Sequence, residues 1–104
     1  MNKNRTIKEI LVLHHSHFDY GYTHSQPVVC ELQRDFIEQA LDLLDANADW
    51  PEISQPQWTC EVTVQVIKWL QTASSKEVAR FGRYLKQGRI GISGLEFNIT
   101  PLCN

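Results

Sequence analysis

The chain has 104 residues, of which 42% are hydrophobic, enough material for one domain with its own core. Ten basic and twelve acidic residues nearly cancel, and no block of like charge occurs that could bind nucleic acid or an anionic membrane, so we expect neither partner. Residues 1–8 are polar, and the apolar run at residues 10–13 is too short for a signal peptide or a membrane span, which predicts a cytoplasmic location.

Two elements are predicted in the first half of the chain. Residues 10–13 form a continuous apolar run, as in a strand that is covered on both faces of a parallel sheet. Turn residues follow, and then a helix is predicted over residues 27–47. Its apolar residues recur three and four positions apart and share one helical face: Val29, Leu32, Phe36, Ala40 and Leu44.

The second half predicts two helices between two strands. Residues 48–57 hold two prolines among polar residues and predict a loop, and residues 58–62 have the composition of a strand. Apolar residues at helical spacing then reach Ala73, and Ser74 with Glu77 has the form of a capping box that opens another helix. Gly88 marks the end of that helix, and alternation over residues 89–93 predicts a last strand.

The predicted order is therefore β-α-β-α-α-β. Strands that are separated by helices favour parallel pairing through right-handed crossovers, so we predict an α/β fold made of the first strands of an incomplete (β/α) barrel. Three strands cannot close a barrel, and we expect an open sheet edge that is available for further chain or for self-association.

The chain contains three cysteines, Cys30, Cys60 and Cys103, which lie far apart and form no C-x-x-C pair. Their odd number argues against a complete disulfide framework. We expect reduced thiols in packing positions.

The informative chemistry lies in residues 14–24, directly after the first predicted strand. In parallel α/β folds, ligands bind beyond the carboxyl ends of the strands. If this segment is extended, His15, His17 and Asp19 project from one side, within reach of one cation. Two imidazoles and a carboxylate suit Zn²⁺ or a similar divalent metal, and we predict His17 and Asp19 as its ligands.

Other residues of this segment have less definite roles. A single histidine at a strand end is usually structural, and we assign that role to His14 and His24, whereas His15 fits either a ligand or a supporting position. Gly21 predicts a sharp turn beside the ligands. The ring of Tyr22 fits either a sugar-binding surface or the rim of the core.

Two glutamates are further candidates. Glu61 lies near the carboxyl end of the second predicted strand and Glu96 follows the third, so a barrel would bring both to the same face as His17. Glycosidases use two carboxyl groups across the scissile bond, which makes these residues candidates for an acid or a substrate contact, although most glutamates are simply solvated.

Residues 15–22 read His-Ser-His-Phe-Asp-Tyr-Gly-Tyr, and this motif resembles the signature of glycoside hydrolase family 38, the retaining α-mannosidases. The likeness extends over most of the chain, through Glu61 and Trp69 in a strand-helix unit and through the step into a strand at residues 86–90, followed by Gly94. The chain thus resembles the N-terminal portion of such a catalytic domain, in a divergent bacterial-type branch, with Tyr22 in place of a tryptophan and no acidic pair at residues 97–101.

The resemblance implies a Zn²⁺ bound by His17 and Asp19, with Tyr22 lying against an α-mannoside or a related glycoside as substrate. In that family a further aspartate is both ligand and nucleophile, and a histidine is the fourth ligand. We expect both beyond Asn104, so no catalytic residue is assigned within this chain, and we expect the isolated chain to be inactive.

Two alternatives stay open from the residues alone. His-x-His after a first barrel strand also occurs in other metal-dependent hydrolases, of the amidohydrolase or phosphoesterase type. A non-catalytic fragment that binds carbohydrate or packs against a partner is the other alternative.

Overall fold

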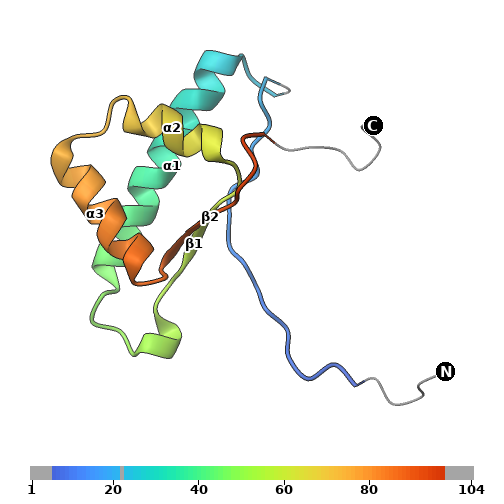
Figure 1. Ribbon diagram of the computed structural model, residues 1–104, viewed down its shortest axis with the longest axis vertical. Coiled ribbons are helices and arrows are strands. Elements are labelled where there is room, and N and C mark those ends of the chain that lie inside the picture. The colour runs from blue at the N-terminus through green and yellow to red at the C-terminus, as the bar shows by residue number, and fades with distance from the viewer. Residues whose placement is uncertain (1–5, 22, 98–104) are drawn as a thin grey trace.

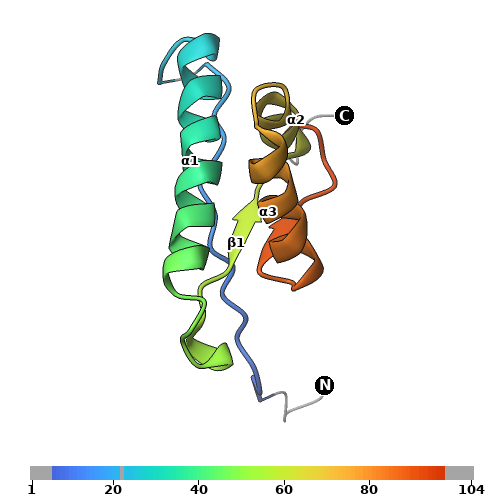
Figure 2. The same ribbon diagram turned by 90° about the vertical axis from the view of Figure 1, so that its left-hand side faces the viewer.

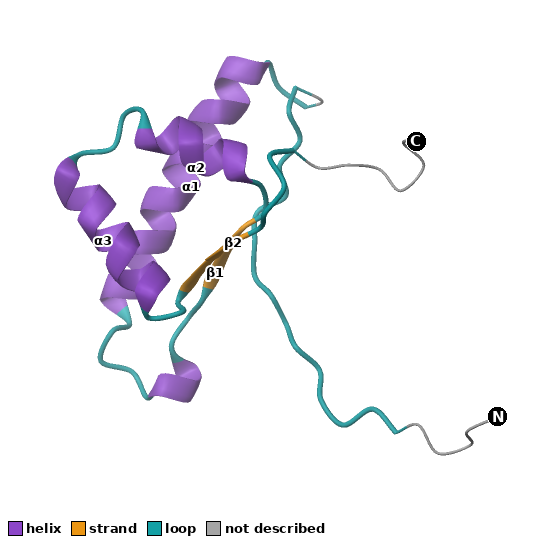
Figure 3. Ribbon diagram, viewed as in Figure 1, coloured by secondary structure: helices purple, strands orange, loops and turns teal. Residues whose placement is uncertain are grey.

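The computed structural model describes residues 6–21 and 23–97. Two strands and three helices form a small α/β unit in which the strands pair in parallel, with Trp58 opposite Ile90 and Cys60 opposite Ile92. The predicted α/β class and parallel pairing are thereby confirmed. The elements in chain order are α1 (Gln26–Ala46), the 3-10 helix η1 (Glu52–Ser54), β1 (Trp58–Cys60), α2 (Thr63–Leu70), α3 (Ser75–Lys86) and β2 (Ile90–Ile92) (Figures 1 and 3).

The three α-helices form one layer against the strands. In Figure 1 they all lie on one side of β1 and β2, and the quarter turn of Figure 2 shows β1 behind the space between α1 and α3. The helices α2 and α3 provide the connection between the parallel strands, as the predicted order requires. The other side of the strands carries no helix of the described chain.

The prediction of a first strand is wrong, because this segment forms no hydrogen-bonded ladder with the sheet. Residues 10–13 are extended but unpaired, and the segment joins the sheet through a single parallel bridge between His15 and Thr59, where the Thr59 N–H donates to the His14 carbonyl over 2.8 Å. Continuing this register backwards would place residues 10–12 opposite residues 54–56, which lie outside the three residues of β1. The chain that precedes β1 also forms the helix η1, so it offers no extended partner to the N-terminal segment there.

Helix α1 is confirmed to within one residue at each end, but the predicted inward face is partly wrong. Leu32 is exposed and Phe36 is only half-buried. The apolar pattern alone was ambiguous because α1 carries apolar residues on two faces, and the buried stripe includes a polar residue, Gln33. The buried residues of α1 are Val29, Cys30, Gln33, Ile37, Ala40, Leu41 and Leu44.

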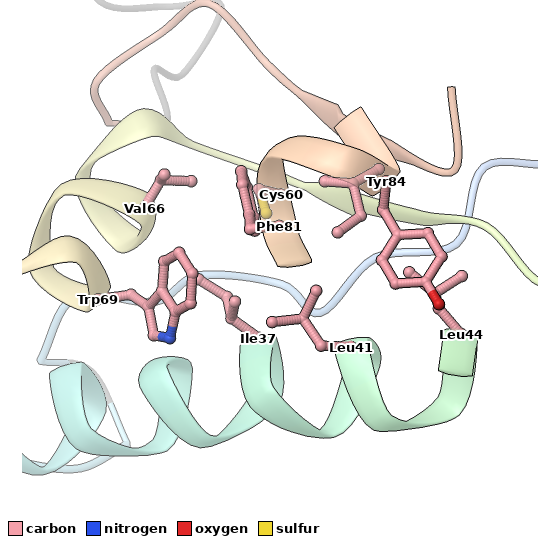
Figure 4. Packing of buried hydrophobic residues seen from close by; sticks show 9 residues of the cluster. Ile37, Leu41, Leu44, Cys60, Val66, Trp69, Phe81 and Tyr84 are labelled. Atoms are coloured by element: carbon pink, nitrogen blue, oxygen red, sulfur yellow. The ribbon is translucent and has the colours of Figure 1, made fainter. Parts of the chain in front are cut away.

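The main core lies where α1, α2, α3 and the strands meet (Figure 4). Leu41, Cys60 and Trp69 have no exposed surface, and the ring of Trp69 packs on that of Phe81 with their centroids 5.0 Å apart. Full burial of a large apolar side chain contributes roughly 1.5–3 kcal/mol to folding. Residues from α1, α2, α3 and β1 thus meet in one cluster that fixes the helices on the strands.

Helix α3 begins and ends where the sequence predicts. The Ser74 hydroxyl accepts a hydrogen bond from the Glu77 N–H at 3.2 Å, which satisfies one of the free donors of the first turn. Gly88 has a φ of +71°, a left-handed conformation that glycine adopts without strain, and Arg89 N–H then closes on the Tyr84 carbonyl at 2.9 Å.

An ionic cluster, here called the Arg80 clamp, joins α3 to the end of α1. The guanidinium of Arg80 lies 2.8 Å from carboxylate oxygens of Asp42, Asp45 and Glu77. The hydroxyl of Tyr84 also donates to Asp45. The Tyr84 hydroxyl and the Arg80 guanidinium together hold the pKa of Asp45 below its usual value, against the opposing effect of burial.

Cys30 and Cys60 are free and buried, as predicted, while Cys103 lies outside the described residues. Burial raises the pKa of the Cys60 thiol to about 12. Among the helices of residues 6–21 and 23–97, none is long and apolar enough to cross a membrane.

Candidate functional site

The histidine-rich segment and the end of β1 meet at one place. After the bridge at His15, the chain passes the carboxyl end of β1, and Glu61 directly follows that strand. Ligand-binding loops gather at this end of a parallel sheet. Two parts of the chain that are far apart in sequence therefore bring their polar side chains together here.

The predicted alternation along the segment holds through Phe18. Its side chain is 4% exposed and packs in a second apolar cluster with Val29, Val62 and Val64. The preceding and following residues, His17 and Asp19, keep much of their surface exposed. Burial of Phe18 thus fixes which side of the segment faces the protein and leaves the candidate ligands on the other side.

Glu61 organises the histidines. Its Oε1 lies 2.8 Å from Nδ1 of His17 and 3.5 Å from Nδ1 of His15, while its Oε2 accepts the Phe18 N–H at 2.6 Å. A carboxylate can only accept hydrogen bonds, so Nδ1 of His17 carries the proton that joins it to Glu61. The side chain of Glu61 is 18% exposed, against 60% for His17, so the better-buried group holds the more exposed one.

The free side of the His17 ring faces Asp19. Nε2 of His17 lies 2.9 Å from Oδ1 of Asp19, so the imidazole sits between two carboxylates. The hydrogen bond and charge of Glu61, followed by the charge of Asp19, raise the pKa of His17 even though its partial desolvation acts in the opposite direction. The ring therefore keeps its second proton to a higher pH than a free imidazole does, and a cation at Nε2 would compete with that proton.

The turn beyond Asp19 depends on glycine. Gly21 has a φ of +99°, and its N–H donates to the Asp19 carbonyl at 3.0 Å, so the chain reverses immediately after the predicted ligand. A Cβ at this position would also lie 3.2 Å from Cγ of Gln26, which is closer than ordinary packing. The predicted sharp turn is confirmed, and a side chain here would strain it.

An aromatic stack lies beside the site. The rings of Phe18 and Tyr20 stack with centroids 5.6 Å apart, and Tyr20 contacts Phe97 at 5.7 Å with a tilt of 55°. The predicted substrate-binding residue Tyr22 lies outside the described residues. The stack joins the histidine-rich segment to the chain that follows β2.

The remaining candidates do not join the cluster. Glu96 is exposed and contributes its backbone carbonyl, which accepts the Val64 N–H at 3.3 Å. His14 is used through its carbonyl, and the His24 ring bonds to Thr23. Glu61 is a candidate for an acid or a substrate contact, and its carboxylate lies against the two histidines and the Phe18 N–H. Its position at the end of a strand was the sequence signal for this contact.

The described residues offer two potential donor atoms for a metal ion, His17 Nε2 and Asp19 Oδ1. Within residues 6–21 and 23–97, no group of three or more His, Cys, Asp or Glu side chains is disposed to hold a metal ion. His17 Nε2 and Asp19 Oδ1 offer two donor atoms 2.9 Å apart. Tetrahedral Zn²⁺ ligands at about 2.0–2.1 Å from the ion lie about 3.3 Å from each other, so this pair would have to open slightly to coordinate one ion.

Comparisons of the chain with protein-family models, with curated proteins and with solved structures each gave no significant match.

Proposed function

We propose that this chain is the N-terminal portion of a zinc-dependent retaining glycoside hydrolase of the α-mannosidase type, family 38, which acts on α-mannosides or related glycosides. The motif at residues 15–22 supports this proposal, and so does the position of that motif at the carboxyl end of a parallel strand. In the same proposal, the parallel strands are the first of a (β/α) barrel, and the protein is cytoplasmic.

One observation carries the proposal. Glu61 holds Nδ1 of His17 at 2.8 Å, so the ring directs Nε2 toward Asp19. Metal-bound histidines almost always give their other ring N–H to a carboxylate, a carbonyl or water, which fixes the tautomer and the ring orientation. A histidine that is merely solvated needs neither the partly buried carboxylate of Glu61 nor a second acidic residue beside it.

The residues of the site then have separate tasks. His17 and Asp19 hold the ion, and Glu61 keeps the imidazole oriented and its Nδ1 protonated. When bound, the ion would orient the hydroxyls of the sugar for the reaction. Tyr22 provides an aromatic surface for the sugar ring. The carboxylate that attacks the anomeric carbon and the remaining metal ligands come from outside residues 1–104, so the chain alone supplies binding groups and no nucleophile.

Calorimetric titration with Zn²⁺ tests the site directly. We expect the chain to bind one Zn²⁺ weakly, because two protein ligands leave most of the coordination to water, and we expect His17→Ala/Asp19→Ala to abolish this binding. Glu61→Gln keeps the shape of the side chain but removes its charge, and should weaken binding about 10- to 100-fold, as for other outer-shell partners. His24→Ala is the matched control, because this histidine lies in the same segment outside the cluster.

Equal binding by the chain and by His17→Ala/Asp19→Ala would contradict the proposed ligands. Hydrolysis of aryl α-mannosides by the 104-residue chain would contradict the assignment of the nucleophile to another part of the protein. Cleavage of phosphomonoesters or cyclic amides, with no cleavage of glycosides, would instead favour a different class of metal-dependent hydrolase.

A further inference from the structure

Two buried glutamines form a chain of hydrogen bonds beneath the candidate metal centre. Gln33 of α1 is 4% exposed and Gln65 of α2 is 1% exposed, and they are the buried polar residues of the described chain. Nε2 of Gln65 donates to Oε1 of Gln33 at 2.8 Å. We call this pair the amide relay.

The relay reaches the backbone at both of its ends. Oε1 of Gln65 accepts the Val62 N–H at 3.2 Å, and Nε2 of Gln33 donates to the His17 carbonyl at 3.4 Å. Each amide therefore accepts through its oxygen and donates through its nitrogen, so the orientation of both side chains is fixed in one direction along the relay. Reversing either amide would place two donors or two acceptors against each other.

The two backbone ends flank the same pair of side chains. Val62 directly follows Glu61, and the accepting carbonyl belongs to His17 itself. The relay thus links the two segments whose side chains meet in the 2.8 Å contact between Glu61 and His17. It makes this link through α1 and α2, and it contacts His17 at the backbone carbonyl.

A purely structural role explains only part of this arrangement. Gln65 lies at the third position of α2 and satisfies the N–H of the residue that precedes the helix, which is an ordinary capping function. That function does not need Gln33, and a buried amide without partners costs free energy that an apolar residue would avoid. A fully satisfied buried network fixes relative positions more narrowly than apolar packing does.

We propose that Gln33 and Gln65 are positioning residues, which set the distance and angle between Glu61 and His17 and so preorganise the metal centre. The part of this inference that concerns metal affinity rests on the proposed function. The part that concerns the contact of Glu61 with His17 does not, because it applies to the metal-free chain as well.

The test compares Gln33→Met with Ile37→Val in the full chain. Met matches the length of Gln but removes both hydrogen bonds, while Ile37 lies one helical turn further along α1 and is 1% exposed, so Ile37→Val perturbs packing without touching the relay. Gln65→Met is the second variant in case Gln33→Met does not fold. Two quantities are measured: Zn²⁺ affinity by calorimetry, and the ring ¹⁵N and ¹H signals of His17 in the metal-free chain by NMR at fixed pH.

We expect Gln33→Met to lower Zn²⁺ affinity about tenfold, at the lower end of the range for outer-shell partners, and to shift the Nδ1 signal of His17 as its bond to Glu61 loosens. Ile37→Val should leave both quantities unchanged. An unshifted His17 signal in the glutamine variants, or the same shift in Ile37→Val, would overturn the inference. If the unmodified chain binds no Zn²⁺, the proposed function fails, and the metal-free His17 signal alone decides the role of the relay.

Discussion

The helical layer and the N-terminal segment use similar apolar residues with opposite results. Leu41 in α1 has no exposed surface, whereas Leu11 is 79% exposed and Val12 is 73% exposed. In Figure 1 the N-terminal segment runs away from the helices and strands, while α1, α2 and α3 stay against the sheet. The two regions differ in their neighbours and not in their hydrophobicity.

The difference shows what local sequence can accomplish. A helix satisfies its backbone hydrogen bonds within itself and needs a partner only for its apolar face, which α1 finds on α2, α3 and β1. An extended segment needs a neighbouring strand for its backbone as well, and residues 10–13 have none in the described chain. The candidate metal centre begins at the bridge of His15 with Thr59, where the extended segment first gains such a neighbour.

The largest effect is expected from a truncation in the helical layer. Trp69→Ala should lower the free energy of unfolding by about 3–5 kcal/mol, because it removes a fully buried ring from the centre of the core. That loss is a large share of the roughly 5–15 kcal/mol that stabilises a typical domain. Urea denaturation measures it. Trp50→Ala is the matched control, since Trp50 is 51% exposed, and a similar loss there would mean that the core is misplaced.

A smaller effect is expected at the Arg80 clamp. Arg80→Met keeps much of the aliphatic stem but removes the ion pairs with Asp42, Asp45 and Glu77, and should lower the free energy of unfolding by about 1–3 kcal/mol. Lys86→Met changes an exposed cation near the end of the same helix and should cost less than about 0.5 kcal/mol. Equal losses in the two variants would show that the clamp contributes nothing specific.

Acid should weaken the same junction by a lesser amount. The pKa of Asp45 is lowered in the folded chain from an ordinary value of 3.8, so the folded state binds this proton less readily than the unfolded state does. The stability that Asp45 contributes is therefore present above 3.8 and is lost as the pH falls through the lower folded value. Because its side chain is 39% exposed, we expect this contribution to be about 1 kcal/mol or less.

Thermal melting between about pH 5 and pH 2 measures the effect. Asp45→Asn should flatten the loss of stability over this range, whereas Asp35→Asn, at an exposed carboxylate of the same helix, should follow the unmodified chain. Parallel curves for Asp45→Asn and the unmodified chain would contradict the assignment.

The smallest effect is expected in the N-terminal segment. Leu11→Ala should change the free energy of unfolding by no more than about 0.5 kcal/mol, because Leu11 already faces solvent. The same substitution at Leu41 should cost about 2–5 kcal/mol. A loss at Leu11 comparable with that at Leu41 would mean that the segment is packed in solution, for example in self-association through the open edge.

The helices were predictable because their signals are local. Ser74 marks the beginning of α3 and Gly88 marks its end, each through hydrogen bonds within a few residues. The apolar spacing located α1 and α2. The inward face of α1 was less predictable, because Leu32 and Phe36 compete with Gln33 and Ile37, and only the packed neighbours decide between them. The prediction of a strand at residues 10–13 was wrong for the same reason, since a strand forms only with a partner elsewhere in the chain.

Within the candidate site, the neighbours within the histidine-rich segment were predictable, and its contacts with distant parts of the chain were less so. Alternation placed His17 and Asp19 together opposite Phe18, which follows from strand geometry alone. The contact of Glu61 with His17 joins residues 44 positions apart, so the sequence could offer Glu61 only as one of two candidates. No sequence motif pointed to Gln33 and Gln65, although a polar residue within the apolar face of a predicted helix is a signal of a buried polar contact that can be sought.

The Arg80 clamp has a practical consequence for protein engineering. Its partner Asp45 lies twelve residues beyond Gln33 on α1, a separation of about 18 Å along the helix axis. Substitutions that strengthen this end of the helical layer therefore act far from His17, Asp19 and Glu61. Thermostable variants can be selected there first and then used as tolerant backgrounds for changes at the candidate metal centre that the unmodified chain would not survive.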